Sequence, residues 1–245
     1  MDIISVALLT VYVVASAIDS VWAEKRDSLR RGSLLPENMS RLLRKIYSRQ
    51  YRYVKFTLMP LLLAFYMASS FFGWPGSLGL APHGPEPLII LALVFGWGGD
   101  AILELSYKLF PLGVASFLTG HVFYIVHFAL QVKWSSLSPW MLFALLPLAA
   151  YVIFMLKNIL PAPKAKPFRV PLIFYLAALV GLLVAAFQRL GSVNPLSFGL
   201  VMAGSVLFVV SDSMLAFHMF GSKGEGGVME TYTLAQLCLV LGALL

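Results

Sequence analysis

Eight stretches, each of roughly 20 predominantly apolar residues, constrain the fold of this chain more than any other feature of its sequence. A helix of about 20 residues spans about 30 Å, the thickness of the hydrocarbon core of a bilayer. The chain is 60% hydrophobic and only 12% charged, which excludes a soluble globule with a polar exterior. The predicted spans are residues 3–23, 55–73, 88–107, 111–132, 139–157, 168–188, 195–220 and 228–245.

The positions of Lys and Arg test this number of spans, because these residues collect in cytosolic connections. Sixteen of the 18 lie in the first, third, fifth and seventh connections, and only Lys133 and Arg189 lie in the others. This placement explains the net charge of +7 without a nucleic-acid partner. We therefore predict an all-α, polytopic transmembrane helical bundle of eight spans, forming a single domain over residues 1–245, with both termini outside the cytosol.

The longest connection, at about residues 24–54, is a basic cytosolic loop. Within it, residues 38–54 have an amphipathic pattern in which Met39, Leu42, Leu43 and Ile46 are interspersed with basic residues. A helix of this kind lies in the headgroup plane of an anionic leaflet, so membrane lipids with anionic headgroups are predicted partners. The alternative is an ordinary basic loop with no lipid preference.

The segment from Phe95 to Leu105 places two acids, Asp100 and Glu104, inside the third predicted span. Their spacing of four residues puts both carboxyl groups on one face of a helix, where a single pocket can hold them. Because an acid inside a bilayer is costly, its presence indicates function by default. The alternative is that one or both bond a neighbouring helix as structural polar groups.

Two motifs recur four spans apart. A lysine followed by a nearby proline opens the second span, at Lys55, and the sixth, at Lys166. The sequence Gly-Asp-Ala-Ile-Leu around Asp100 resembles Ser-Asp-Ser-Met-Leu around Asp212. A parallel four-plus-four repeat explains both matches and makes the two aspartates symmetry mates that face one cavity. The matches are short, and chance similarity is the alternative explanation.

Further polar residues lie on the other predicted spans. His121 and Tyr124 are three residues apart and share one face of the fourth span. The predicted topology places His121 near mid-depth and five other polar residues in the cytosolic half, so a cavity that they share opens toward the cytosol. These five residues are Asp100, Glu104, Asp212, Tyr232 and Gln236.

The sequence lacks the usual motifs of several hydrolase classes. It has no G-x-S-x-G, S-x-x-K or H-E-x-x-H pattern, which leaves serine hydrolases and zincins without support. A single cysteine, Cys238, excludes an internal disulfide and a cysteine-rich metal site. We predict no cofactor or metal. The alternative is a zinc site drawn from Asp100, His121, Asp212 and His218.

Taken in order, these motifs resemble the signatures of the YhhN family, the lysoplasmalogenase-like membrane proteins. The matching stretches are Gly99–Leu103, His121–Tyr124, Val210–Asp212 and the pair Tyr232 and Gln236. Lys55 with Pro60 also resembles the start of the family's second helix, where the two residues are usually closer. The resemblance covers spans two to eight. The long basic loop departs from it, as does Glu104, where the family commonly has an apolar residue.

The resemblance implies a hydrolase that cleaves the vinyl-ether bond of a lysoplasmalogen to a fatty aldehyde and a glycerophospho-ethanolamine or -choline. An enol ether hydrolyses by protonation at carbon and then attack of water, which calls for one protonated acid and one ionised carboxylate. Two carboxyl groups in a low-dielectric site do not easily ionise together, so they divide these roles. We therefore predict Asp100 and Asp212 as the catalytic pair, with the acid unassigned.

The predicted supporting residues are His121, Tyr124, Lys55, Ser211, Tyr232, Gln236 and Glu104. His121 and Tyr124 are expected to position water or the ether oxygen, and Lys55 to meet the substrate phosphate. For each of the three, a structural role is the alternative.

Two other classes of function stay open. One is a proton-coupled transporter of lipid or solute, and the other is a zinc-dependent membrane lipid amidase. The predicted location is the plasma or inner membrane of a prokaryote, or the endoplasmic reticulum of a eukaryote.

Overall fold

The computed structural model is helical throughout the main body of the chain and describes residues 3–30, 37–72, 84–105, 109–133, 139, 143, 145–221 and 227–245. Within 23–30 and 37–52, only the backbone is described. The helices are α1 (Ile3–Arg30), α2 (Glu37–Phe72), α3 (Pro87–Leu105), α4 (Phe110–Ala129), α5 (Leu145–Asn158), α6 (Arg169–Gln188), α7 (Pro195–Phe220) and α8 (Val228–Ala243). A short 3-10 helix, η4 (Pro163–Phe168), precedes α6.

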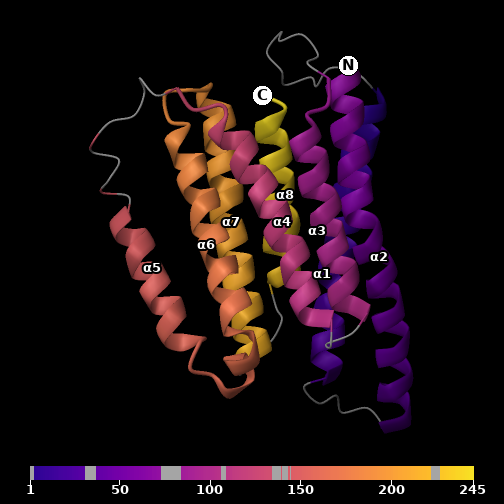
Figure 1. The fold of residues 1–245 in the computed structure, drawn as a ribbon. Coiled ribbons are helices and arrows are strands. Elements are labelled where there is room, and N and C mark those ends of the chain that lie inside the picture. Colours follow the sequence, from indigo (N-terminus) through magenta and orange to yellow (C-terminus); the bar gives the residue numbers. More distant parts are fainter. Residues whose placement is uncertain are drawn as a thin grey trace.

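Consecutive helices run antiparallel, so the start of α1 and the end of α8 lie at the same end of the bundle (Figure 1). Helices α1, α3, α5 and α7 all end at the opposite end. The four connections to which the sequence assigns sixteen basic residues therefore lie at one end of the molecule. Between Lys25 and Lys55, all of these basic residues except Arg31 belong to α1 and α2, which extend toward that end. That this end faces the cytosol stays a prediction from charge.

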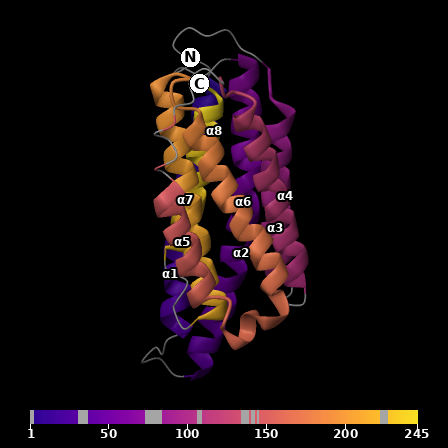
Figure 2. The same ribbon diagram turned by 60° about the vertical axis from the view of Figure 1, so that its left-hand side comes forward.

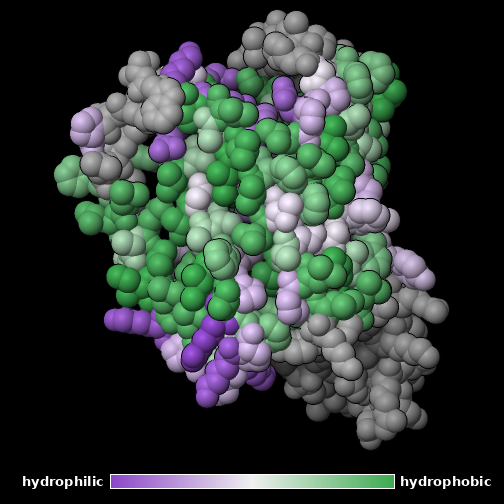
Figure 3. Space-filling view, in the orientation of Figure 1, coloured by the Kyte–Doolittle hydropathy of each residue, from purple (hydrophilic) through white to green (hydrophobic). Residues whose placement is uncertain are grey.

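The described helices are apolar enough for a bilayer. Six segments are long and apolar enough to cross one: Ile3–Trp22, Tyr53–Phe72, Pro87–Leu105, Phe110–Ala129, Pro163–Gln188 and Pro195–Phe220. Helices α5 and α8 are apolar but shorter. The face in Figure 3 has a broad hydrophobic band between hydrophilic residues near the two ends. The chain is thus a multi-pass membrane protein, and the number of eight spans stays a prediction.

Three helices differ in extent from the prediction, and the first is α1, which continues to Arg30 instead of ending at residue 23. Helix α2 is one continuous helix from Glu37, so the predicted amphipathic helix at 38–54 extends the second span instead of forming a separate in-plane helix. No Gly or Pro lies between Glu37 and Pro60, so nothing in that stretch ends the helix. The side chains of residues 38–52 lie outside the described residues, and the lipid preference of this segment stays a prediction. In the described residues, α5 begins at Leu145, later than the predicted residue 139.

Small residues let two pairs of helices approach closely. In α3, a Cβ atom at Gly99 would lie 2.6 Å from the Phe117 ring of α4. In α7, a Cβ atom at Gly204 would lie 2.9 Å from the backbone oxygen of Ala235 in α8. Close packing at glycine is the usual way for membrane helices to associate, because lipid gives little hydrophobic drive. The two helices that carry Asp100 and Asp212, α3 and α7, are therefore each packed closely against a neighbouring helix.

The first helices of the two halves pack differently. Helix α1 packs along α2 and against α8. Helix α5 lies on the outside of the bundle next to α7 (Figures 1 and 2). It contacts α7 through a hydrogen bond of 2.9 Å between the Tyr151 and Ser213 hydroxyls and through the rings of Phe154 and Phe217. The four-plus-four repeat therefore stays a prediction.

Candidate active site

A cavity of about 260 Å³ lies where α3 and α7 end and α4 and α8 begin. Glu104, in the last turn of α3, and Val228, in the first turn of α8, both line it. The cavity therefore lies toward the end of the bundle that the charge pattern predicts to be cytosolic. Its polar lining comes from Lys55, Asp100, Glu104, Tyr175, Ser211, Asp212, His218 and Tyr232.

Asp100 is buried and contacts polar groups from two other helices. The Tyr232 hydroxyl of α8 donates a hydrogen bond to Oδ2 of Asp100 at 2.9 Å. Nζ of Lys55, from α2, lies 3.7 Å from Oδ1 of Asp100 and 3.7 Å from Oε1 of Glu104. Both oxygens of Asp100 thus face donors, and the Lys55 ammonium group lies between the two carboxyl groups of α3.

Tyr232 is held by a chain of hydrogen bonds from two residues that do not line the cavity, Tyr124 and Gln236. The Tyr124 hydroxyl donates to Oε1 of Gln236 at 2.7 Å. Nε2 of Gln236 donates in turn to the Tyr232 hydroxyl at 3.4 Å. Gly96 leaves room for this chain, because a Cβ atom there would lie 3.2 Å from Nε2 of Gln236. Two buried side chains, Tyr124 of α4 and Gln236 of α8, therefore hold the Tyr232 hydroxyl that contacts Asp100.

Asp212 has different partners. The Tyr175 hydroxyl of α6 donates to Oδ2 of Asp212 at 2.7 Å. Nε2 of His121, from α4, lies 4.0 Å from the same oxygen. Among the described residues, these are the polar partners of Asp212, and neither is a lysine or arginine. The two aspartates thus share one cavity but differ in the charge beside them.

His121 presents an unpaired nitrogen to the Asp212 side of the site. Its Nδ1 lies 2.8 Å from the backbone oxygen of Phe117, which can only accept, so Nδ1 carries the hydrogen. In the neutral imidazole, Nε2 is then a bare acceptor. Nε2 is buried and has no hydrogen-bond partner in the described structure. A buried acceptor of this kind fits a water molecule or a substrate hydroxyl.

The structure brings most of the predicted site residues together. Six line the cavity, His121 adjoins it through Asp212, and Tyr124 and Gln236 lie behind Tyr232. Ser211 lines the cavity, but its hydroxyl donates to the backbone oxygen of Val228 at 3.0 Å and so anchors the start of α8. These placements show where the predicted residues lie, and their assignment to a functional site stays a prediction.

The alternative zinc site has little geometric support. Among the side chains that the structure describes, no three His, Cys, Asp or Glu residues are grouped closely enough to hold a metal ion. The four candidate ligands predicted from the sequence therefore do not form such a group.

Tyr175 is the main residue that the sequence reasoning missed. It lines the cavity and contacts Asp212 directly. A signal was present, because Tyr175 is the only residue between Val170 and Phe187 whose side chain has a polar atom. A lone hydroxyl in an otherwise apolar span is expected to find a buried partner.

The fold and the cavity together define a multi-pass helical membrane protein with an acidic site enclosed by its helices. The model of the YhhN family matches residues 50–243, which include every predicted site residue. The chain belongs to the YhhN family, as its motifs predicted. Comparison with curated proteins and with solved structures gives no significant match.

Proposed function

We propose that this protein is a membrane hydrolase of lysoplasmalogen vinyl ethers, with Asp212 as the acid and Asp100 as the base. The unequal surroundings of the two carboxyl groups support this assignment most directly. Asp100 lies 3.7 Å from the Lys55 ammonium group, whereas Asp212 contacts the Tyr175 hydroxyl. A neighbouring cation favours an ionised carboxyl group, and burial without one favours the protonated form. Membership of the YhhN family is consistent with this activity.

In the first step, Asp212 donates its proton to the alkenyl carbon that is not bonded to oxygen. The alkene electron pair forms the new C–H bond, and the carbon bonded to oxygen becomes an oxocarbenium ion. Asp212 is now ionised, and the hydrogen bond of 2.7 Å from Tyr175 to its Oδ2 stabilises the new charge. Asp100 adds a second negative charge in the same cavity, which stabilises the cation.

In the second step, water adds to the oxocarbenium carbon while Asp100 accepts one of its protons. The product is a hemiacetal. Its hydroxyl proton passes to Asp212 as the bond to the glycerol oxygen breaks, and that oxygen takes the proton from Asp100. Both aspartates return to their starting states, one water is consumed, and a fatty aldehyde and a glycerophospho-alcohol leave.

The remaining residues are proposed to hold these groups in place. Nε2 of His121 accepts a hydrogen bond from water or from a hydroxyl group beside Asp212. The chain from Tyr124 through Gln236 positions the Tyr232 hydroxyl on Asp100. Lys55 keeps Asp100 ionised and, at the cavity wall, also meets the substrate phosphate.

The proposal is tested by incubating the purified protein in detergent with a lysoplasmalogen in D₂O. We expect a fatty aldehyde with one solvent-derived deuterium at the carbon next to the carbonyl, because protonation occurs at carbon. The matching saturated ether should yield no aldehyde, since it has no alkene to protonate. Excess chelator should leave the rate unchanged.

Three outcomes would contradict the proposal. A folded preparation that releases no aldehyde excludes this substrate. Loss of activity with chelator, restored by zinc, favours the metal-dependent alternative. Substrate movement into vesicles without aldehyde release favours a transporter, since a transporter moves its substrate without consuming it.

A further inference from the structure

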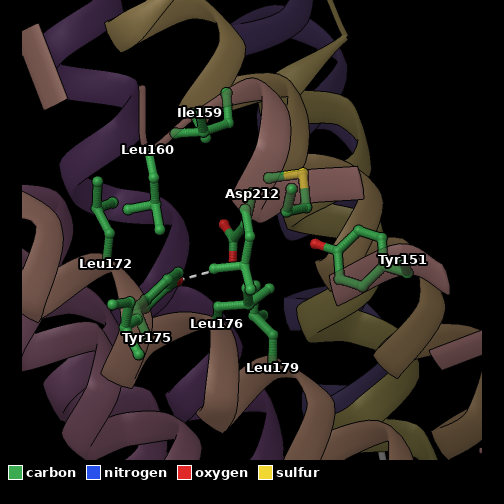
Figure 4. Close-up of a pocket in the computed structure, with 12 residues that line it drawn as sticks. Tyr151, Ile159, Leu160, Leu172, Tyr175, Leu176, Leu179 and Asp212 are labelled. Carbon is green, nitrogen blue, oxygen red and sulfur yellow. Dashed lines mark hydrogen bonds between the residues drawn. The ribbon is translucent and has the colours of Figure 1, made fainter. Parts of the chain in front are cut away.

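A narrow apolar groove lies next to the Asp212 side of the cavity. It is enclosed by α5, α6 and α7 and has a volume of about 40 Å³. Its walls are formed by aliphatic side chains, among them Met155, Leu160, Leu172 and Leu176. Figure 4 shows Asp212 between the side chains of Tyr151 and Tyr175, with Leu160 and Leu172 on the Tyr175 side.

The groove and the polar cavity share part of their walls. Tyr175 and Asp212 line both, and they also line a third, apolar pocket of about 50 Å³ that lies between α4, α6 and α7. The pair Tyr175 and Asp212 therefore marks the boundary between a polar region and an apolar one. A molecule with a polar head and one hydrocarbon chain matches this division, with its head–chain junction at Asp212.

The outer wall of the groove faces the region that lipid occupies. Phe154 of α5 and Ile173 of α6 are 51% and 47% exposed, so both present apolar surface outward. Only one residue of α5, Met155, is buried. The helix contacts α7 through the Tyr151–Ser213 hydroxyl pair and the Phe154–Phe217 rings. A wall with so few buried contacts separates from the bundle more easily than the tightly packed α7–α8 pair.

We infer that the groove between α5, α6 and α7 is the binding site for the hydrocarbon chain of a single-chain lipid, which reaches Asp212 sideways from the bilayer. This inference rests on the proposed function for the place of the scissile bond. In a lysoplasmalogen, the vinyl ether is where the chain joins the head, so the chain in the groove puts that bond at Asp212. The head then lies in the polar cavity.

A binding experiment tests the groove without requiring catalysis. The probe is a saturated-ether lysophospholipid, which the proposed chemistry cannot cleave, with a photoreactive diazirine on its chain a few carbons from the ether oxygen. On irradiation of the full-length protein in detergent, we expect labelling at Leu160, just after α5, and at Leu172 and Ile173 of α6. Unlabelled lysophospholipid should compete with this labelling.

A kinetic experiment tests the same groove during turnover. Ala216 lines both the groove and the third pocket, so the larger side chain in Ala216→Phe fills the space that the inference assigns to the hydrocarbon chain. We expect kcat/KM for a long-chain vinyl ether to fall at least about tenfold relative to a short-chain one. Ala203→Phe is the matched control, because Ala203 is exposed on the same helix. Its chain-length preference should be that of the wild type.

The outcomes separate this inference from the proposed function. Groove labelling without aldehyde release keeps the chain site and excludes the vinyl-ether reaction. Aldehyde release with labelling confined to α1 or α2, or with unchanged chain-length preference in Ala216→Phe, overturns the chain site alone. Labelling by a two-chain phospholipid that lysophospholipid does not displace shows a structural lipid in the groove, and also overturns the inference.

Discussion

Replacing Tyr232 with Phe is expected to destabilise the protein more than replacing Tyr175 with Phe. Each substitution deletes one hydroxyl, which donates to Asp100 at 2.9 Å in the first case and, in a partly buried position, to Asp212 at 2.7 Å in the second. A hydrogen bond to a charged group contributes about 1.5–3 kcal/mol, and one between neutral groups about 0.5–1.5 kcal/mol. If Asp100 is ionised and Asp212 protonated, Tyr232→Phe lowers the free energy of unfolding by about 2 kcal/mol and Tyr175→Phe by about 1 kcal/mol.

Double-mutant cycles separate this charge effect from ordinary hydrogen bonding. Asn keeps an oxygen that accepts from tyrosine but has no charge, so Asp100→Asn should lower the cost of Tyr232→Phe. We expect a coupling free energy of about 1 kcal/mol for that pair. Asp212→Asn replaces a neutral carboxyl group by a neutral amide, so its coupling to Tyr175→Phe should be within about 0.5 kcal/mol of zero.

The assay is equilibrium unfolding in mixed micelles at neutral pH, followed by tryptophan fluorescence. Tyr151→Phe is the matched control, because its hydroxyl contacts the neutral Ser213 hydroxyl at 2.9 Å. Tyr151→Phe should lower the free energy of unfolding by about 1 kcal/mol. Equal coupling at both aspartates, or the larger value at Asp212, would refute the assignment of acid and base.

Two further substitutions test the support of Asp100. Gly96→Ala adds a Cβ atom 3.2 Å from Nε2 of Gln236 and should lower kcat about tenfold, because it displaces the Gln236 amide that holds Tyr232. Gly199→Ala is the control, since a Cβ atom there has no neighbour within 4 Å, and it should leave the rate of aldehyde release unchanged. Lys55→Met removes the cation 3.7 Å from Asp100 and should lower kcat at least about a hundredfold, whereas Lys55→Arg retains most of the activity. Equal rates for the two Lys55 variants would show that charge at this position does not matter.

The membrane class and the acidic site were predictable from sequence for a simple physical reason. Apolar segments of about 20 residues are typical of transmembrane helices, which limits the possible folds. An acid inside such a segment is energetically costly and therefore indicates a functional residue. Asp100 and Asp212 were therefore visible as candidates, and the structure places both in one cavity. The order of the motifs also predicted the YhhN family, which the family match confirms.

The packing of the helices against one another could not be predicted from hydropathy and motifs. Hydropathy gives the depth of a residue but not its neighbours, so the pairing of Asp212 with Tyr175 required the packing of α6 on α7. The role of Gly96 depends on Gln236, which is far away in sequence. The helix at 38–54 and the span at 55–73 were both predicted, but their continuity as α2 was not, because hydropathy gives no sign that a polar helix continues into an apolar one.

The most direct test of the two-carboxylate account is the rate of aldehyde release by three purified variants, Asp100→Asn, Asp212→Asn and Glu230→Gln. Glu230 is an exposed acid on α8 outside the cavity lining, so its amide variant controls for loss of a carboxylate elsewhere. We predict that each aspartate variant loses at least about a hundredfold in kcat while remaining folded, and that Glu230→Gln matches the wild type. Wild-type rates in either folded aspartate variant would contradict the account.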